Sequence, residues 1–366
     1  MDFSRAPFLV IWETTRACAL ACVHCRADAI ARRDPRELTT EEGFPLIDQV
    51  RAMADAPAKP PLFVLTGGDP MRRRDLADLV RYASTAGLTV ALTPSGTAAA
   101  TQSRLAELKD AGLSRIAVSL DGPDAGSHDA FRGVRGSYAW TMRIIESAIG
   151  LGLPLQINST ISRLTLPNLE AMAARVSQLP LTLWALFFLI RTGRGASLEQ
   201  VSADECERVL NFLYDLSLTA PFGIKTTEAP QYQRVVWQRE QDRAARGLPA
   251  TSITRRRQLR APRSVNDGNG FVFVDHVGNI CPSGFLPAPR GNVRTSSLAD
   301  VYRTDDLFRR LRDSDALAGK CGRCRFRAMC GGSRSRAFAA TGAVLASDPL
   351  CAYEPGPMTE PLVAQA

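Results

Sequence analysis

The sequence predicts an α/β protein, in which a largely parallel sheet flanked by helices is followed by a small cysteine-rich C-terminal domain. Three observations predict this fold class. Short apolar segments alternate with longer helix-like segments over the first 190 residues. The short segments are almost continuously apolar, as strands covered on both faces are. The alternation stops after about residue 195, and cysteines gather again near the C-terminus.

The apolar pattern justifies each element in turn. Strands are predicted at residues 7–12, 61–66, 88–93, 113–120, 153–161 and 181–190. Helices are predicted between them at 39–53, 75–87, 104–112, 138–150 and 167–179. Thr39 or Thr40 can cap the first helix, and Gly87 can end the second. Parallel strands joined by helices imply right-handed crossovers. Six such units form a partial barrel or an open doubly wound sheet, and periodicity alone favours neither.

The second half of the chain has a different organisation. An amphipathic helix is predicted at 202–217, followed by a polar, Arg-rich stretch at 231–263 that we interpret as a linker or as a cover over a substrate opening. A hairpin begins a new unit at about 270. The predicted division is therefore a core at 1–200, a bridging helix and linker at 201–265, and a cysteine-rich domain at 266–366.

Composition limits the function classes. The chain has 366 residues and a formal net charge of +8, and only four of its 45 basic residues are Lys. Such a surface attracts anions or acidic partner proteins. Its nine cysteines follow no signal-peptide pattern, and no apolar run is long enough to span a bilayer. We expect a cytoplasmic protein with reduced thiols and no membrane partner.

Three cysteines follow the first predicted strand with the spacing C-x3-C-x2-C, namely Cys18, Cys22 and Cys25. Three thiolates this close in sequence can hold three corners of a cubic iron–sulfur cluster and leave the fourth iron open. A structural metal site would normally have a fourth protein ligand. The alternative is a set of unrelated, inert buried thiols.

A glycine-rich turn, Gly67-Gly68-Asp69-Pro70, follows the second predicted strand. Two glycines let the backbone approach a ligand closely, although a turn of this kind is unremarkable alone. Together with the cysteine loop it resembles radical S-adenosylmethionine (SAM) enzymes. The resemblance implies a partial (β/α)6 barrel. It also implies a [4Fe–4S] cluster on the three cysteines and SAM bound to the open iron. The reduced cluster would split SAM into a 5′-deoxyadenosyl radical that takes a hydrogen atom from the substrate.

The resemblance also implies SAM contacts for several further residues. His24 stands where the family usually has an aromatic ring near the adenine, and Asp69 stands where it usually has Glu. Ser119 and Asn158 match places that touch the carboxylate and ribose of SAM. Residues 187–195 would close the sixth strand near the adenine. Arg132 can pair with a carboxylate, of a ligand or of the protein itself.

Four cysteines in the tail form a second set: Cys321, Cys324, Cys330 and Cys351. Four thiolates can close a site around a cluster or around zinc. The pattern resembles the SPASM extension of radical SAM enzymes, which implies an auxiliary [4Fe–4S] cluster. Ser296 and Arg334 stand where a full extension has further cysteines, so one auxiliary cluster is expected. Cys281 would then be a remnant, a buried thiol or a substrate-side group, and Cys206 a core residue.

The opening and closing motifs are similar to those of the radical SAM branch that modifies tetrapyrroles in the alternative haem pathway. That similarity implies oxidative decarboxylation or another change of propionate side chains, with an acidic electron donor such as flavodoxin or ferredoxin. A peptide-modifying maturase is the second interpretation, and a zinc-containing nucleic-acid-binding protein is the third. We expect no nucleic-acid partner, because no recognised reading motif is present. Histidine acid–base catalysis is not expected, and His276 is predicted to be solvated in a turn.

Overall fold

The computed structural model describes residues 2–54, 60–251 and 265–356. Its strands are β1 (Leu9–Glu13), β2 (Leu62–Thr66), β3 (Thr89–Leu92), β4 (Leu113–Ser119), β5 (Leu155–Ile161), β6 (Leu183–Phe188), β7 (Gly223–Thr227), β8 (Phe271–Val274), β9 (Asn279–Cys281) and β10 (Gly291–Asn292). The larger helices of the first part are α1 (Thr40–Ala52), α2 (Leu76–Thr85), α3 (Gln102–Asp110), α4 (Ala125–Arg132), α5 (Ser137–Gly150), α6 (Leu169–Ser177), α7 (Ala203–Ser217) and α8 (Tyr232–Ala245). The tail carries α10 (Leu298–Thr304), α11 (Asp306–Arg312), α12 (Gly319–Arg323) and α13 (Arg334–Thr341).

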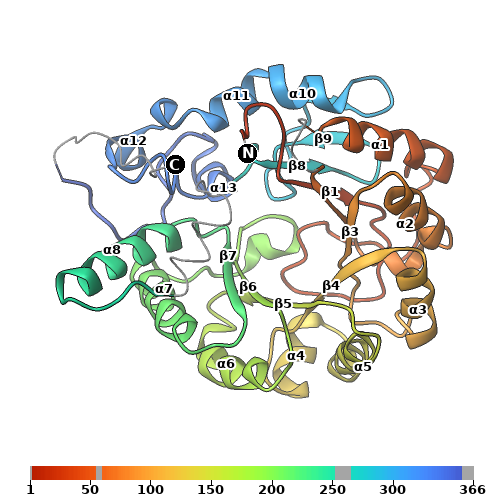
Figure 1. Cartoon of the computed structure of the whole chain (residues 1–366), viewed down its shortest axis with the longest axis horizontal. Coiled ribbons are helices and arrows are strands. Elements are labelled where there is room, and N and C mark those ends of the chain that lie inside the picture. The colour runs from red at the N-terminus through yellow and green to blue at the C-terminus, as the bar shows by residue number, and fades with distance from the viewer. Residues whose placement is uncertain (1, 55–59, 252–264, 357–366) are drawn as a thin grey trace.

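The described strands form a ten-stranded sheet in the order β10-β9-β8-β1-β2-β3-β4-β5-β6-β7. Strands β8 and β1 to β7 are parallel, and β9 and β10 add an antiparallel edge. The sheet curls into an incomplete barrel with helices around its outside (Figure 1). The predicted α/β fold class is confirmed. The curled sheet shows that the arrangement is the partial barrel and not the open doubly wound sheet.

The six predicted strands are all present, and two further parallel strands extend the sheet. Strand β7 pairs with β6, and β8 pairs with β1, so the hairpin at about 270 continues the barrel sheet. The Arg-rich stretch that we interpreted as a linker begins instead as helix α8, which buries Tyr232, Val235 and Val236. Residues 252–264 of that stretch lie outside the described residues.

The two faces of the barrel sheet differ in their exposure to solvent. Outward side chains such as Trp12, Phe63 and Trp184 are completely buried in the core between strands and helices. Inward side chains on the same strands, such as Val64 and Phe187, remain partly exposed. Solvent therefore reaches the inner face of the barrel, where a substrate can be held.

Candidate active site and auxiliary cysteine centre

The first cysteine set lies in the loop that leaves the carboxyl end of β1, on the side of the barrel where parallel α/β enzymes place their chemistry. This loop folds back on itself. The amide of Cys18 donates to the carbonyl of Ile30 at 2.9 Å. The guanidinium of Arg16 donates to the carbonyls of Ala27 and Asp28 at 2.9 and 2.7 Å. The loop is thus held as a closed ring that contains all three thiols.

Each thiol of this loop has a nearby N–H donor. The amide of Leu20 lies 3.3 Å from Cys18 Sγ, and the amide of Ala29 lies 3.4 Å from Cys25 Sγ. The guanidinium of Arg132 lies 3.7 Å from Cys22 Sγ. Burial raises the pKa of the Cys18 thiol, and a bound cation would favour its thiolate form. N–H donors around the sulfurs stabilise thiolate ligands, and the loop therefore fits a bound cluster.

The glycine-rich turn after β2 packs directly on this loop. The amide of Gly68 donates to Thr15 O at 2.7 Å, and the amide of Asp69 donates to Ala17 O at 2.8 Å. A Cβ on Gly68 would lie 2.5 Å from the carbonyl oxygen of Arg16, so only glycine fits. Ser95 Oγ donates to Gly68 O at 2.5 Å and also lies 3.5 Å from Cys18 Sγ. The structure thus brings the first two predicted motifs together.

Asp69 is completely buried, and its carboxylate holds the turn. It accepts hydrogen bonds from Thr97 Oγ1 at 2.7 Å and from the amide of Met71 at 3.1 Å, and it caps the short 3-10 helix η1 (Pro70–Arg72). Burial raises its pKa, and these hydrogen bonds oppose the rise. The Asp69 side chain therefore positions the backbone of Gly67, Gly68 and Pro70, whose carbonyls are the candidate ligand groups.

Ser119 and Asn158 face the inside of the barrel on adjacent strands. They are directly paired in the β4–β5 register, and both are partly exposed. Asn158 Oδ1 accepts a hydrogen bond from Gln156 at 2.7 Å, which leaves its amide nitrogen free to donate. These two polar groups lie side by side on the inner face of the barrel, as expected for contacts to one ligand.

Arg132 forms a protein ion pair. Its guanidinium pairs with the buried carboxylate of Asp121, which also accepts from the amide of Thr160 at 2.6 Å. Of the two roles considered for Arg132, the structure shows the ion pair with the protein's own carboxylate. That pair links the carboxyl end of β4 to the thiol of Cys22.

His24 stacks on Phe131, with ring centroids 4.3 Å apart and an interplanar angle of 15°. Its Nδ1 is buried without a hydrogen-bond partner among the described residues. Burial and the nearby Arg132 lower the pKa of His24 to about 3, so the ring is neutral at physiological pH. A neutral ring with an unsatisfied nitrogen can face a ligand such as a nucleobase.

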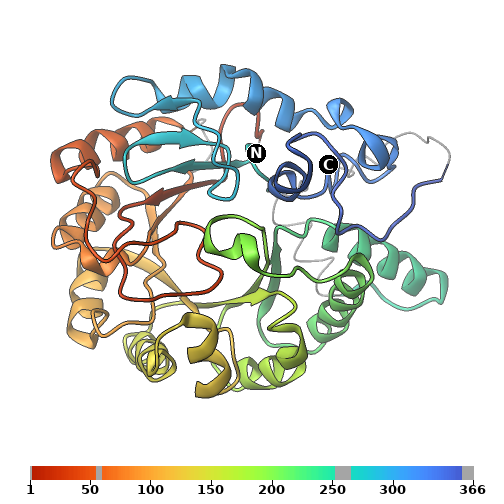
Figure 2. The ribbon, with the colours of Figure 1, turned by 180° about the vertical axis from the view of Figure 1, so that it is seen from behind.

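Arg194 is a residue of this site that the sequence pattern did not single out. It lies in the 3-10 helix η3 (Gly193–Ser197), which follows β6 and covers the cysteine loop (Figure 2). Its amide donates to Cys25 O and its Nε donates to Cys22 O, both at 3.0 Å. A Cβ on Gly193 would lie 2.4 Å from Cys25 O, which explains the glycine. Residues 187–195 thus end against the cysteine loop.

The four cysteines of the tail also lie close together. Cys321, Cys324, Cys330 and Cys351 line one cavity together with Arg234, Lys320 and Arg327. Amides lie close to three of the sulfurs: Phe326 N is 3.4 Å from Cys324 Sγ, Gly332 N is 3.5 Å from Cys330 Sγ, and Asp348 N is 3.4 Å from Cys321 Sγ. Four thiolates, amide donors and surrounding cations fit an anionic cluster.

Two positions that lack the cysteine of a full SPASM pattern have other roles. Arg334 is buried, and its guanidinium lies 3.7 Å from Cys321 Sγ, so a cation lies beside this predicted cluster ligand. Ser296 packs against Gly291. Cys281 is a buried thiol whose pKa is raised by burial to about 12. Cys206 is a core residue, as predicted, and burial likewise raises its pKa to about 12.

The prediction for His276 is wrong. This residue is buried, and its Nδ1 lies 2.9 Å from Glu13 Oε1. Arg26 Nη2 donates to the other oxygen of Glu13 at 2.5 Å. The turn closes onto the end of β1 because the buried Glu13 carboxylate needs both partners.

The described side chains contain no group of three or more His, Cys, Asp or Glu arranged to hold a single metal ion.

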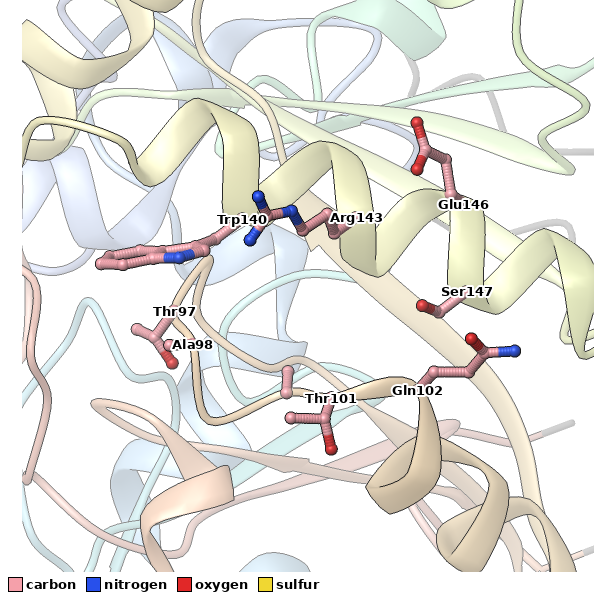
Figure 3. A pocket seen from close by; sticks show the side chains of 9 residues that line it. Thr97, Ala98, Thr101, Gln102, Trp140, Arg143, Glu146 and Ser147 are labelled. Atoms are coloured by element: carbon pink, nitrogen blue, oxygen red, sulfur yellow. The ribbon is translucent and has the colours of Figure 1, made fainter.

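A cavity with a volume of about 470 Å³ lies elsewhere, between α5 and the segment that leads into α3 (Figure 3). Trp140 and Arg143 line it from the helix, and Thr101 and Gln102 line it from the other side. It lies outside the barrel and has none of the nine cysteines in its wall.

Comparison with known proteins identifies the family. The model of the radical SAM superfamily matches residues 12–173. The AdoMet-dependent heme synthase of Oleidesulfovibrio alaskensis is 39% identical over 97% of this chain and 89% of its own length. The chain belongs to the radical SAM superfamily. The heme synthase of Methanosarcina barkeri is 36% identical over 96% of this chain and 98% of its own length.

A solved structure shows the same fold. SuiB of Streptococcus suis, bound to its precursor peptide SuiA, covers 95% of this chain and 76% of its own, with a TM-score of 0.69 and 13% identity. Membership of the superfamily makes the chain an iron–sulfur enzyme that uses SAM. None of the described helices is long and apolar enough to cross a membrane.

Proposed function

We propose that this enzyme oxidatively decarboxylates propionate side chains of an iron-containing tetrapyrrole, as a haem synthase. The observation that carries the proposal is the end-to-end similarity to AdoMet-dependent heme synthases, at 36–39% identity over 96–97% of the chain. This similarity spans both cysteine sets.

In the proposed site, Cys18, Cys22 and Cys25 hold the SAM-binding [4Fe–4S] cluster. SAM lies against the turn Gly67 to Pro70, the polar pair Ser119 and Asn158, and the neutral ring of His24. Cys321, Cys324, Cys330 and Cys351 hold the auxiliary [4Fe–4S] cluster. When bound and reduced, the first cluster and SAM supply a 5′-deoxyadenosyl radical that takes a hydrogen atom from the substrate.

The inner face of the barrel suits a flat, mostly apolar substrate with acidic arms. The partly exposed side chains there include Ile11, Val64, Leu183, Phe187 and Phe271. Each propionate must lose one hydrogen atom, one carbon dioxide and one electron to become a vinyl group. The hydrogen atom goes to the deoxyadenosyl radical. The electron needs an acceptor, which is the role we propose for the auxiliary centre.

The proposed electron donor is an acidic protein such as flavodoxin or ferredoxin, because the net charge of +8 favours an anionic partner. The reduced thiols that cluster assembly requires favour a reducing, cytoplasmic location. Neither a nucleic acid nor a membrane is a proposed partner.

The test compares iron-coproporphyrin III with candidate precursor peptides. Each is incubated without oxygen with reconstituted enzyme, SAM and a reductant, and products are analysed by mass spectrometry. We expect loss of one carbon dioxide and two hydrogens for each propionic acid converted, matched by formation of 5′-deoxyadenosine. Conversion of a peptide with no change in the porphyrin would replace this proposal with the maturase function.

A further inference from the structure

A lysine lies on the inner face of the barrel, on a strand that the sequence pattern did not reveal. Strand β7 pairs with β6 in a register that sets Lys225 beside Ala185 and Thr227 beside Phe187. Trp184 and Leu186, the alternate residues of β6, belong to the buried outer core. Because side chains alternate across a strand, Lys225 and Thr227 both point toward the inside of the barrel.

Lys225 is exposed to solvent there, whereas the inward residues beside it on β6 are buried or only partly exposed. Protein surrounds it closely enough that burial lowers its pKa, and no charged group of the described residues offsets this change. No hydrogen bond or ion pair to Lys225 occurs within the described part of the chain. The ammonium group is therefore a solvent-accessible cation on the inner face that lacks a counter-ion among the described residues.

Thr227 gives a second, independent sign of a missing ligand. Its hydroxyl oxygen is buried without a hydrogen-bond partner among the described residues. A buried hydroxyl without a partner is destabilising until a ligand supplies the missing hydrogen bond. A carboxylate satisfies both groups at once, since it accepts from an ammonium and from a hydroxyl.

Other cations near the inner face already have partners in the protein. Arg26 donates to Glu13 and lies over the ring of Phe273, and Arg132 pairs with Asp121. These arginines are occupied in holding the cysteine loop and the strand ends. Lys225 has no such structural task, although Lys is rare in this Arg-rich chain.

We propose that Lys225 and Thr227 form a binding site for a carboxylate of the substrate inside the barrel. The proposal rests on the proposed function for the identity of that carboxylate as a tetrapyrrole propionate. Anchoring one acidic arm on β7 fixes how the ring lies, and thereby which other arm is presented to the cysteine loop. Lys225 is thus a substrate-binding residue that determines specificity.

The test compares wild-type enzyme with Lys225→Met, which keeps the length of the side chain without its charge, and with Lys225→Arg, which keeps the charge. Lys109→Met is the matched control, because Lys109 lies on the outer surface and donates to the carbonyl of Leu151. Binding of iron-coproporphyrin III and of its tetramethyl ester is measured by optical titration. Substrate-free cleavage of SAM reports on the folded cluster site.

We expect Lys225→Met to weaken binding of iron-coproporphyrin III about 10- to 100-fold, the range for a hydrogen bond to a charged group. Lys225→Arg should recover most of the loss, and Lys109→Met should bind as wild type does. The ester should bind equally to wild type and Lys225→Met. Equal affinity of wild type and Lys225→Met for the free acid overturns the inference while leaving the proposed function intact. A wild-type enzyme that neither binds nor converts the porphyrin overturns both.

Discussion

The contact between the glycine-rich turn and the cysteine loop gives the sharpest test of the site. In Gly68→Ala the new Cβ would lie 2.5 Å from the carbonyl oxygen of Arg16 and 2.6 Å from that of Ala17. Real Cβ contacts essentially never fall below 3.0 Å, so the two backbones must separate by at least about 0.5 Å. The backbone hydrogen bonds from Gly68 and Asp69 hold them together at 2.7 and 2.8 Å.

Strain of this kind costs about 1–3 kcal/mol, and we expect the melting temperature of Gly68→Ala to fall by about 1–4 °C. Since a displacement of about 1 Å can lower a rate about 100-fold, formation of 5′-deoxyadenosine should fall at least tenfold. Gly150→Ala is the matched control, because no atom lies within 4 Å of its added Cβ. Calorimetry and chromatographic assay of 5′-deoxyadenosine measure the two effects. A Gly68→Ala enzyme with the stability and rate of wild type would refute this account of the turn.

Three further changes test other parts of the protein. Cys22→Ala should abolish reductive cleavage of SAM, measured as 5′-deoxyadenosine, and a variant that still forms this product would contradict the cluster assignment. Cys324→Ala should lower the iron content by about four atoms while some substrate-free cleavage of SAM persists; loss of all iron would show instead that the tail centre is needed for folding. Burial lowers the pKa of His128 to about 4, so the native protein binds fewer protons there than the unfolded chain, and stability should fall as pH drops from about 6.5 toward 4. Urea unfolding at pH 7 and pH 5 should show this loss in wild type and a smaller one in His128→Gln, and equal losses would rule out His128 as the source.

Local sequence patterns predicted those strands and helices whose buried positions are marked by apolar residues in the sequence. The six strands are rich in apolar residues, because helices bury their outer faces in the core. The Thr39 cap is likewise visible in the sequence, and the structure completes it with a reciprocal contact from Glu42. These features depend on neighbouring residues, and local periodicity is enough to find them.

Strand β7 and helix α8 were missed for a physical reason. The sequence Gly-Ile-Lys-Thr-Thr of β7 lacks an apolar run because its inner face is polar and its edge is unpaired on one side. Helix α8 buries residues only in its first turns, so the sequence of its remaining turns is polar and resembles that of a linker. Pairing of β8 with β1 joins residues more than 250 positions apart, and no local pattern contains that information.

In the candidate site, the residues that bear the chemistry were predictable, whereas those that position them were not. Cysteine spacing revealed both thiol sets, but Arg194 contacts the cysteine loop from 165 or more residues away. His276 was expected in solvent because its partner, Glu13, lies on the first strand. Such contacts depend on the tertiary fold, and a lone arginine or histidine carries no signal of them.

A buried chain of polar contacts joins the tail centre to the strand that carries Lys225. The amide of Asp348 lies 3.4 Å from Cys321 Sγ, and the Asp348 carboxylate pairs with Arg336 at 3.2 Å. The same guanidinium donates to the carbonyl of Glu228 at 2.7 Å, three residues beyond Lys225. Removing either charge alone would leave the other buried and unpaired, at a cost of about 3–5 kcal/mol. These contacts therefore fix the position of the tail relative to β7. A substrate carboxylate bound at Lys225 would lie on the same strand that this chain of contacts links to the proposed electron acceptor.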